Sequence, residues 1–363
     1  MLRLALLLLL LAGCAQRTEF RVLSQPGSGQ TERVYISTLR GVSVTEEFSF
    51  ERAEASRYLS LDVSVPPDRK AGEITPQRGK TLDPTKQFFF QAREDFASRA
   101  AFRAALKREI QSRKAEQRYA VIFVHGYNTS FPDGVLRLSQ MSHDFELGGV
   151  ALHYAWPSRA SAFGYQYDRD STLMARQGLE ELISDARASG AREVVLLAHS
   201  MGSFLTMEAL QQMELAQKDS VRRSVNAVVL ISPDIDVDVF RAQATRIGPL
   251  PDVFAVFVSK RDRALSLSAL LTGRTQRLGN ISETSELSDL NVVLIDVSDF
   301  SSGLGHFNLA NSPALIGLFG RAGEIDAAFR AAERQNVGLL SGAIISLQGA
   351  TQLVLSPLAQ AVD

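Results

Sequence analysis

Residues 194–202, with the sequence V-V-L-L-A-H-S-M-G, place the strongest constraint on the fold. An apolar run ends at Ala198, a serine follows at position 200, and helix-forming residues begin after Gly202. This pattern predicts a buried strand, a sharp turn between small residues, and a helix. We therefore expect Ser200 at the apex of a strand–turn–helix unit.

Strand-like and helical segments alternate on both sides of this unit. Strands are expected at residues 34–38, 58–65, 119–124, 150–156, 193–198, 227–231, 253–258 and 292–297, and helices at residues 92–117, 134–145, 171–189 and 203–216. Most of these strands are apolar throughout, as in parallel sheets that helices cover on both faces. The sequence thus predicts an α/β fold with a mostly parallel central sheet and helices on both faces.

The turn is one residue short of the G-x-S-x-G nucleophile elbow of α/β-hydrolases, because Ala198 stands where the first glycine is expected. A nucleophilic serine needs a histidine base, a carboxylate that orients the base, and donors that stabilise the oxyanion. In α/β-hydrolases the acid and then the histidine follow the serine along the chain. Ser200 is therefore the candidate nucleophile, with its partners expected downstream.

Chain order leaves one candidate for the base. The five histidines are His125, His143, His153, His199 and His306. Only His306 follows Ser200, and it lies in a glycine-containing segment after the last expected strand. His306 is the predicted base, with a surface-loop histidine as the alternative. His125 and His199 are expected to hold neighbouring loops.

The acid is expected after a strand downstream of the elbow. Asp262 follows the second such strand, where the triad acid usually lies, and is the favoured candidate. Asp234 follows the first and remains an alternative, with a turn residue as its structural role. Asp296 and Asp299 lie too close to His306 in sequence for the usual arrangement.

The oxyanion hole requires two backbone N–H groups. One is expected from Met201, which follows the nucleophile. The other is expected from the loop His125-Gly126-Tyr127-Asn128, which directly follows the strand at residues 119–124. Tyr127 is the predicted second donor, and Asn128 is expected to hold the loop.

The N-terminus has the pattern of a secretory signal. Residues 1–13 contain one cation and a short apolar run, too short to span a bilayer, which takes about 20 residues. The run ends in Leu11-Ala12-Gly13-Cys14, which resembles a bacterial lipoprotein box. Cys14, the only cysteine, is thus the expected lipidation site. The alternative is an ordinary cleaved signal peptide.

The lipoprotein pattern implies a protein of the bacterial cell envelope. Ala15 after the cysteine, instead of aspartate, implies retention in the outer membrane, on its periplasmic side. The formal net charge of −1 gives no electrostatic basis for nucleic-acid binding. Metal-ligand spacing, a phosphate loop and a dinucleotide fingerprint do not occur in the sequence, so no metal or cofactor is expected.

The domain organisation follows from these patterns. We expect a signal peptide at residues 1–13, a tether at 14–31, a hydrolase domain at 32–335 and an apolar segment at 336–363. Within the domain, residues 32–118 form strands, a loop and a helix, and residues 119–320 form the catalytic core. Residues 336–358 predict a helix packed on the domain, with a membrane-surface segment or a spanning helix as alternatives.

The chain resembles a family of bacterial α/β-hydrolases whose function is not established. The matching blocks include H-G-Y-N at residues 125–128, W-P-S at 156–158, Tyr165 with Asp168, A-H-S-M-G at 198–202, S-P-D-I-D at 232–236, D-R-A-L at 262–265 and G-H at 305–306. The resemblance implies that Ala198 is a family feature and supports Asp262 over Asp234.

Triad and resemblance together predict a membrane-anchored serine hydrolase. Its substrate would be a small-molecule or lipid ester, cleaved by an esterase-like or lipase-like reaction. A peptidase, thioesterase or acyltransferase would use the same residues. A non-catalytic lipoprotein that uses the fold for binding or scaffolding is the rival class, because fold does not determine function.

Overall fold

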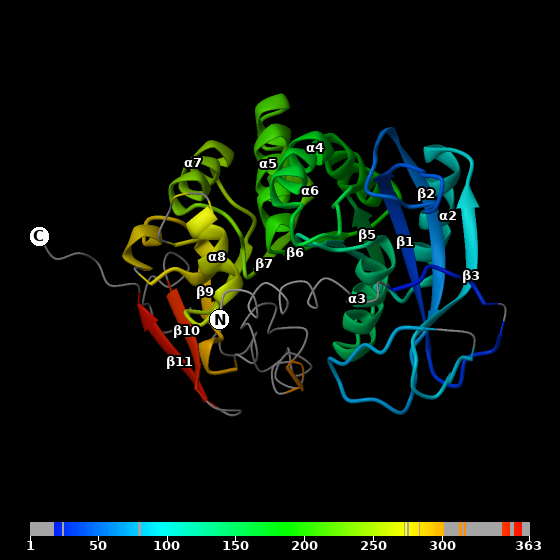
Figure 1. Cartoon of the computed structure of the whole chain (residues 1–363). Helices are drawn as coiled ribbons and strands as arrows, with labels where there is room; N and C mark the ends of the chain where they lie inside the picture. Colours follow the sequence, from blue (N-terminus) through cyan, green and yellow to red (C-terminus); the bar gives the residue numbers. More distant parts are fainter. Residues whose placement is uncertain are drawn as a thin grey trace, which may run out of the picture.

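The structure is a computed structural model that describes residues 18–23, 25–78, 81–271, 273, 276–282, 284–300, 312–313, 316, 343–348 and 352–357. Cys14 and His306, two of the predicted functional residues, lie outside the described residues. The described strands form one sheet of eleven strands in the order β11-β10-β9-β8-β7-β6-β4-β5-β1-β2-β3 (Figure 1).

The parallel part of the sheet runs from β10, described below, to β1. Its other strands are β1 (Thr31–Arg40), β4 (Tyr119–Val124), β5 (Val150–Ala155), β6 (Glu193–His199), β7 (Ala227–Ile231), β8 (Val253–Val258) and β9 (Val293–Asp296). On one side, β2 (Arg52–Ser64) and β3 (Phe89–Phe96) continue the sheet in antiparallel pairing. The predicted α/β-hydrolase fold with a mostly parallel sheet is confirmed.

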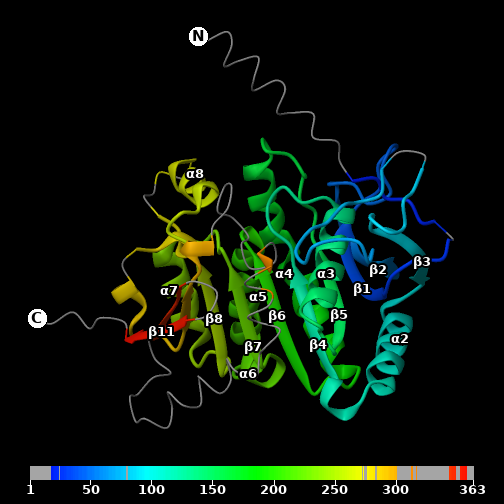
Figure 2. The ribbon, with the colours of Figure 1, turned by 90° about the horizontal axis from the view of Figure 1, so that it is seen from below.

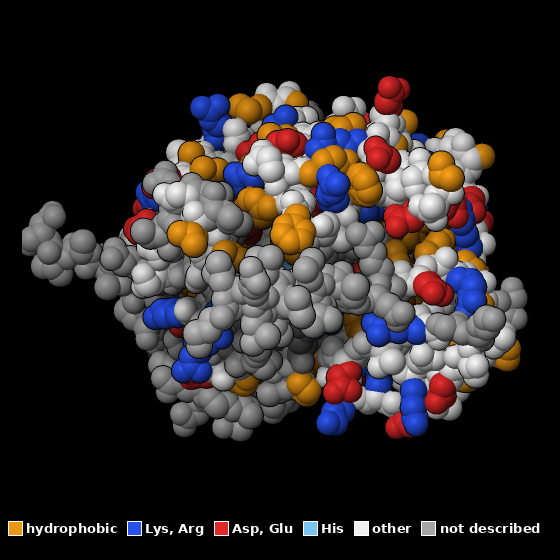
Figure 3. All heavy atoms as spheres, viewed as in Figure 1, with side chains coloured by type: hydrophobic (Ala, Val, Ile, Leu, Met, Phe, Trp, Pro, Cys, Tyr) orange, Lys and Arg blue, Asp and Glu red, His pale blue; other side chains and the backbone are white. Residues whose placement is uncertain are grey.

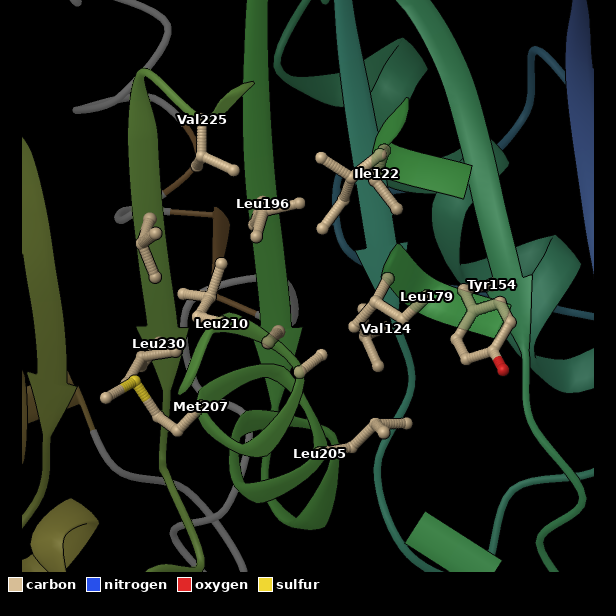
Figure 4. Packing of buried hydrophobic residues seen from close by; sticks show 14 of the residues in the cluster. Ile122, Val124, Tyr154, Leu179, Leu196, Leu205, Met207, Leu210, Val225 and Leu230 are labelled. Carbon is tan, nitrogen blue, oxygen red and sulfur yellow. The ribbon is translucent and has the colours of Figure 1, made fainter. Parts of the chain in front are cut away.

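Helices cover both faces of this sheet. They are α2 (Arg99–Ser112), α3 (Phe131–Asp144), α4 (Tyr165–Ala188), α5 (Met201–Ala216), α6 (Ser220–Ser224), α7 (Val237–Ile247) and α8 (Arg263–Leu271). On one face, Leu196 of β6 packs with Leu205 and Leu210 of α5 (Figure 4). On the other face, Phe123 of β4 packs with apolar residues of α3. Each such buried side chain contributes about 1.5–3 kcal/mol of apolar burial, so both faces stabilise the sheet.

The prediction of a helix at residues 92–117 is wrong for the first residues of this range. Residues 92–96 belong to β3, which pairs with β2 at the edge of the sheet. Helix α2 begins only at Arg99, where the Ser98 hydroxyl accepts the N–H of Ala101 at 3.2 Å. An edge strand exposes charged side chains, and in the sequence these resembled one face of a helix.

The helix expected near the C-terminus is also wrong. Residues within it form β10 (Ala343–Gln348) and β11 (Gln352–Pro357), which pair with each other in antiparallel register. Strand β10 pairs in parallel with β9 and so extends the sheet. Each strand has six residues, a length typical of strands. Among the described residues, none of the helices combines the length and apolarity needed to cross a membrane.

The loops that carry the candidate site gather at one edge of the sheet. Parallel strands end at the same edge, so the segments after β4, β5, β6, β7 and β8 converge there. Helix α8 lies at this edge, whereas α2 and α6 lie toward the other one (Figure 2). This carboxyl edge is where ligands bind in open α/β sheets.

Candidate active site

Ser200 occupies a strained turn between β6 and α5. Its backbone has φ 51° and ψ −122°, a conformation that residues with a side chain rarely adopt. Two backbone bonds hold it: Ser200 N–H donates to the carbonyl of Ile231 at 3.0 Å, and its own carbonyl accepts the N–H of Asp234 at 3.2 Å. The predicted strand–turn–helix unit is therefore present, with the serine at its apex.

Two glycines let the neighbouring loop approach this turn. A Cβ on Gly126 would lie 2.5 Å from His199 Nδ1 and 3.0 Å from the Cβ of Ser200. A Cβ on Gly202 would lie 2.3 Å from the carbonyl oxygen of His125. Contacts this short are not tolerated, so only glycine fits at either position. The H-G-Y-N loop thus lies directly against the serine turn.

Backbone N–H groups from two sides are available near Ser200. Met201 is the first residue of α5, and the first N–H groups of a helix have no intrahelical acceptor. The positive end of the helix dipole lies at the same place, which favours negative charge there. Tyr127 follows Gly126 in the adjacent loop, so its backbone is close to the turn as well. Both residues are therefore close to the Ser200 turn.

The side chain of Tyr127 is used to fix the loop. Its hydroxyl donates to the carbonyl of Ala162 at 2.6 Å, and its ring packs against Tyr165 with ring centroids 5.5 Å apart. Burial raises the pKa of this hydroxyl to about 12. Tyr127 therefore joins its loop to the loop after β5.

A buried carboxylate binds the H-G-Y-N loop from behind. Asp168 of α4 accepts the N–H of Asn128 at 3.1 Å, the hydroxyl of Ser158 at 2.6 Å and the N–H of Arg159 at 2.6 Å. Asn128 has φ 55°, a left-handed conformation that this bond stabilises. Burial raises the pKa of Asp168. The carboxylate thereby joins the loop after β4 to the loop after β5.

A buried guanidinium joins the same two loops. Arg40, at the end of β1, donates to the carbonyl of Thr129 at 2.7 Å and to that of Ser158 at 3.0 Å. Burial lowers its pKa to about 10, and the negative charge of Asp168 is the largest effect that opposes this shift. Sequence reasoning did not assign Arg40 a role, and it found Asp168 only as part of a family block.

The two candidate acids have different surroundings. Asp234 accepts hydrogen bonds from Tyr165 at 3.0 Å and Ser268 at 2.6 Å, and it forms a buried ion pair with Arg277 at 3.1 Å. Its carboxylate is thus committed to a structural network. Asp262 is also buried, and its Oδ1 accepts the N–H of Leu265 at 3.0 Å at the start of α8.

Asp262 lies at the carboxyl edge of the sheet. It follows β8, which is two strands away from β6 in the sheet, a separation of about 10 Å at the usual strand spacing. A histidine side chain between a serine and this carboxylate spans such a gap. His306, the expected occupant, lies outside the described residues.

Two of the described histidines, His125 and His153, are buried in the framework. His125 is buried with its ring nitrogens 2.9 Å from the carbonyl of Gly126 and 3.0 Å from that of Trp156, and burial holds its pKa well below the ordinary value. His153 is buried behind it, and burial lowers its pKa to about 3. His143 lies on α3 beside Glu32. These contacts agree with a structural role for His125.

A cavity of about 410 Å³ opens beside the serine turn. Its lining includes His125, Gly126 and His199 next to the turn, and Ile74 and Leu136 farther away. This volume is within the range of small-molecule sites. Clusters of three or more metal-ligating side chains are absent from the described part of the chain.

Fold and site together define an α/β-hydrolase. The chain belongs to the family described as alpha/beta hydrolase of unknown function (DUF900), whose sequence model matches residues 98–321. No curated protein matches the chain. Among solved structures, an extracellular alpha/beta-hydrolase from a Paenibacillus species is similar at 9% identity and a TM-score of 0.27, covering 64% of this chain and 90% of that one. A likeness this low adds no argument to the family match.

Proposed function

We propose that the protein is a membrane-anchored serine hydrolase that cleaves an ester or related acyl bond. The observation that carries this proposal is the strained Ser200 turn, pressed against the H-G-Y-N loop through Gly126. A non-glycine residue is held at positive φ only where the surroundings enforce it, and such strain concentrates at functional sites. The turn places Ser200 at the carboxyl edge of the sheet.

In the proposed reaction, Ser200 attacks the acyl carbon while His306 accepts the proton from its hydroxyl. The oxygen of the tetrahedral intermediate receives hydrogen bonds from the backbone N–H groups of Met201 and Tyr127. His306 then donates its proton to the leaving alcohol, and water repeats the sequence on the acyl-enzyme. Asp262 orients the imidazole and stabilises its charged form.

Substrates of several classes suit this chemistry. Carboxylic esters are the default, because an ester needs only a serine, a base and an oxyanion hole. A peptidase, thioesterase or acyltransferase would differ in the walls of the site. No cofactor enters the proposed reaction.

We further propose that lipidated Cys14 anchors the protein to the cell envelope, at the periplasmic side of the outer membrane. The lipoprotein box and the single cysteine support this. Changing Cys14→Ser should release the protein into the soluble fraction. Tight membrane association of that variant would contradict the anchor.

The catalytic proposal is tested with a panel of acyl esters of graded chain length. The wild-type protein should hydrolyse at least one of them, and Ser200→Ala should not. A folded wild-type protein that is inert on the whole panel would favour a binding or scaffolding lipoprotein. If the wild-type protein is active, the ester with the highest kcat/KM defines the preferred acyl chain length.

A further inference from the structure

The described chain begins at the same edge of the sheet as the candidate active site. The hydroxyl of Thr18 donates to Asp133 at 2.5 Å, in the first turn of α3 after the H-G-Y-N loop. Phe20 packs edge-on against Phe90 and Phe131, with ring centroids 5.0 and 5.2 Å apart. The N-terminal segment is thus fixed to the domain at the carboxyl edge.

The proposed lipidation site is only four residues before this fixed point. A chain extends at most about 3.6 Å per residue, so Cys14 lies within about 14 Å of Thr18. A lipid attached to Cys14 therefore holds the carboxyl edge, and not the opposite edge, close to the membrane.

The carboxyl edge also exposes large apolar side chains. Phe163, in the loop before α4, is 95% exposed, and Leu267 and Leu270 of α8 are 57% and 74% exposed. The two elements are joined by a hydrogen bond of 2.9 Å between the hydroxyls of Tyr165 and Ser268. These three residues, which we call the apolar rim, lie on the segments that follow β5 and β8.

Helix α8 has two different faces. Leu265, Ser268 and Ala269 are buried against the domain, while Leu267 and Leu270 point outward where a soluble helix normally carries polar residues. An outward apolar face with basic neighbours is typical of helices that lie in a membrane interface.

Basic side chains stand next to the apolar rim. Lys260, Arg261 and Arg263 lie between the end of β8 and the start of α8, and all three are exposed. Two of them form surface ion pairs, Lys260 with Asp296 at 4.0 Å and Arg261 with Asp299 at 3.8 Å. Exposed basic residues near a lipid surface are attracted by anionic headgroups. In the space-filling view, hydrophobic, basic and acidic side chains are interspersed around the residues that are not described (Figure 3).

From these observations we infer that the carboxyl edge lies against the lipid layer that holds Cys14, with the apolar rim inserted among the lipids. The substrate is then an acyl ester that enters the site from this layer. This inference rests on the proposed function, because it gives that site its orientation and its source of substrate.

Fluorescence quenching by brominated lipids tests the orientation. Lipidated protein carrying Ser200→Ala is placed in vesicles of phosphatidylethanolamine and phosphatidylglycerol with brominated acyl chains. One sample carries Phe163→Trp, and the control carries Leu215→Trp, an exposed residue at the far end of α5. Trp156 is buried and gives both samples the same background.

We expect the bromine atoms to quench Trp at position 163 and to leave Trp at position 215 unchanged. Equal quenching at both positions, or at neither, would overturn the inference. Flotation of the vesicles reports the anchor separately. Protein that does not float overturns the anchor and the inference with it, whereas floating protein with equal quenching overturns the orientation alone.

A second test links the apolar rim to the substrate. Two esters are compared, one embedded in vesicles and one short and water-soluble. In the double variant Leu267→Ser with Leu270→Ser, the ratio of vesicle-ester to soluble-ester turnover should fall by roughly tenfold, as expected for the loss of two apolar contacts. Leu215→Ser should keep the wild-type ratio. An unchanged ratio in the double variant would contradict a substrate drawn from the membrane.

Discussion

The carboxylate of Asp168 accepts the backbone N–H of Asn128 at 3.1 Å, across 40 residues of sequence. Asn128 directly follows Tyr127, so this bond positions the loop that is proposed to supply one oxyanion donor. Arg40 holds the next residue of the loop, Thr129, through its carbonyl. The H-G-Y-N loop is therefore held in place by two buried charged side chains, Asp168 and Arg40.

Replacing this carboxylate should reduce turnover more than substrate affinity. In Asp168→Asn, one backbone bond weakens and Tyr127 shifts from the oxyanion position. We expect kcat to fall roughly tenfold to a hundredfold, since misplaced donors lose transition-state stabilisation, while KM changes little. Steady-state kinetics measure both. Asp170→Asn, at an exposed position of α4, is the control and should behave as wild type. A change confined to KM would argue against this positioning role.

The two candidate acids should respond differently to the same substitution. Asp262→Asn should lower kcat by about ten-thousandfold, the size of effect seen when a triad acid is lost, with little change in stability. Asp234→Asn leaves the buried Arg277 without its negative partner and should lower the free energy of unfolding by about 3 kcal/mol. Kinetics and chemical denaturation of both variants distinguish the roles. A reversed pattern would make Asp234 the acid.

Placing the expected glycine at position 198 of the elbow should increase neither the stability nor the activity of the protein. Ala198 is buried in β6, between β4 and β7. Ala198→Gly loses a buried methyl group and adds backbone freedom in a strand, so the free energy of unfolding should fall by about 1–2 kcal/mol. Ala120→Gly, at a buried position of β4, should cost a similar amount. Higher activity without loss of stability in Ala198→Gly would show that alanine is a defect.

The buried His153 should make the protein less stable in mild acid. Its pKa is about 3 in the folded protein but about 6.5 in an unfolded chain. As pH falls below about 6.5, only the unfolded chain takes up this proton, so the free energy of unfolding decreases. Between pH 7 and pH 5 this residue should account for about 2 kcal/mol.

Denaturation of wild type and His153→Asn at both pH values measures this contribution. Asparagine keeps a donor for the carbonyl of Phe123, which His153 Nδ1 approaches at 3.2 Å, and it does not titrate. The variant should therefore lose less stability in acid than the wild type. Parallel losses in the two proteins would contradict the burial of a neutral imidazole.

The sequence predicts the parallel sheet and the serine turn because each depends on local patterns. Apolar runs identify β4 to β8, and the residues around Ser200 identify the turn. The sequence predicts helix at residues 92–96 and 343–348, whose place in the sheet depends on pairing with strands that are distant in the sequence. Local composition does not contain that information.

The contacts that hold the H-G-Y-N loop could not be predicted from the sequence for the same reason. Arg40 and Ser158 are 118 residues apart, and only the fold brings them to a hydrogen bond of 3.0 Å. The one signal was the resemblance, which contains W-P-S and Asp168 among its blocks. The surroundings of the two candidate acids are also created by the fold. Asp234 contacts Arg277, Tyr165 and Ser268, whereas Asp262 accepts the N–H of Leu265.

The most direct test of the central claim is covalent labelling of Ser200 by a fluorophosphonate probe. The probe reacts with a serine hydroxyl only when a base removes its proton and an oxyanion hole receives the phosphoryl oxygen. Mass spectrometry of the digested wild-type protein should show one modified peptide, which contains Ser200. Ser203→Ala, which changes a buried hydroxyl one turn away, should still be labelled, and Ser200→Ala should not. A folded wild-type protein that stays unmodified, or one modified at another serine, would contradict the assignment of Ser200 as the nucleophile.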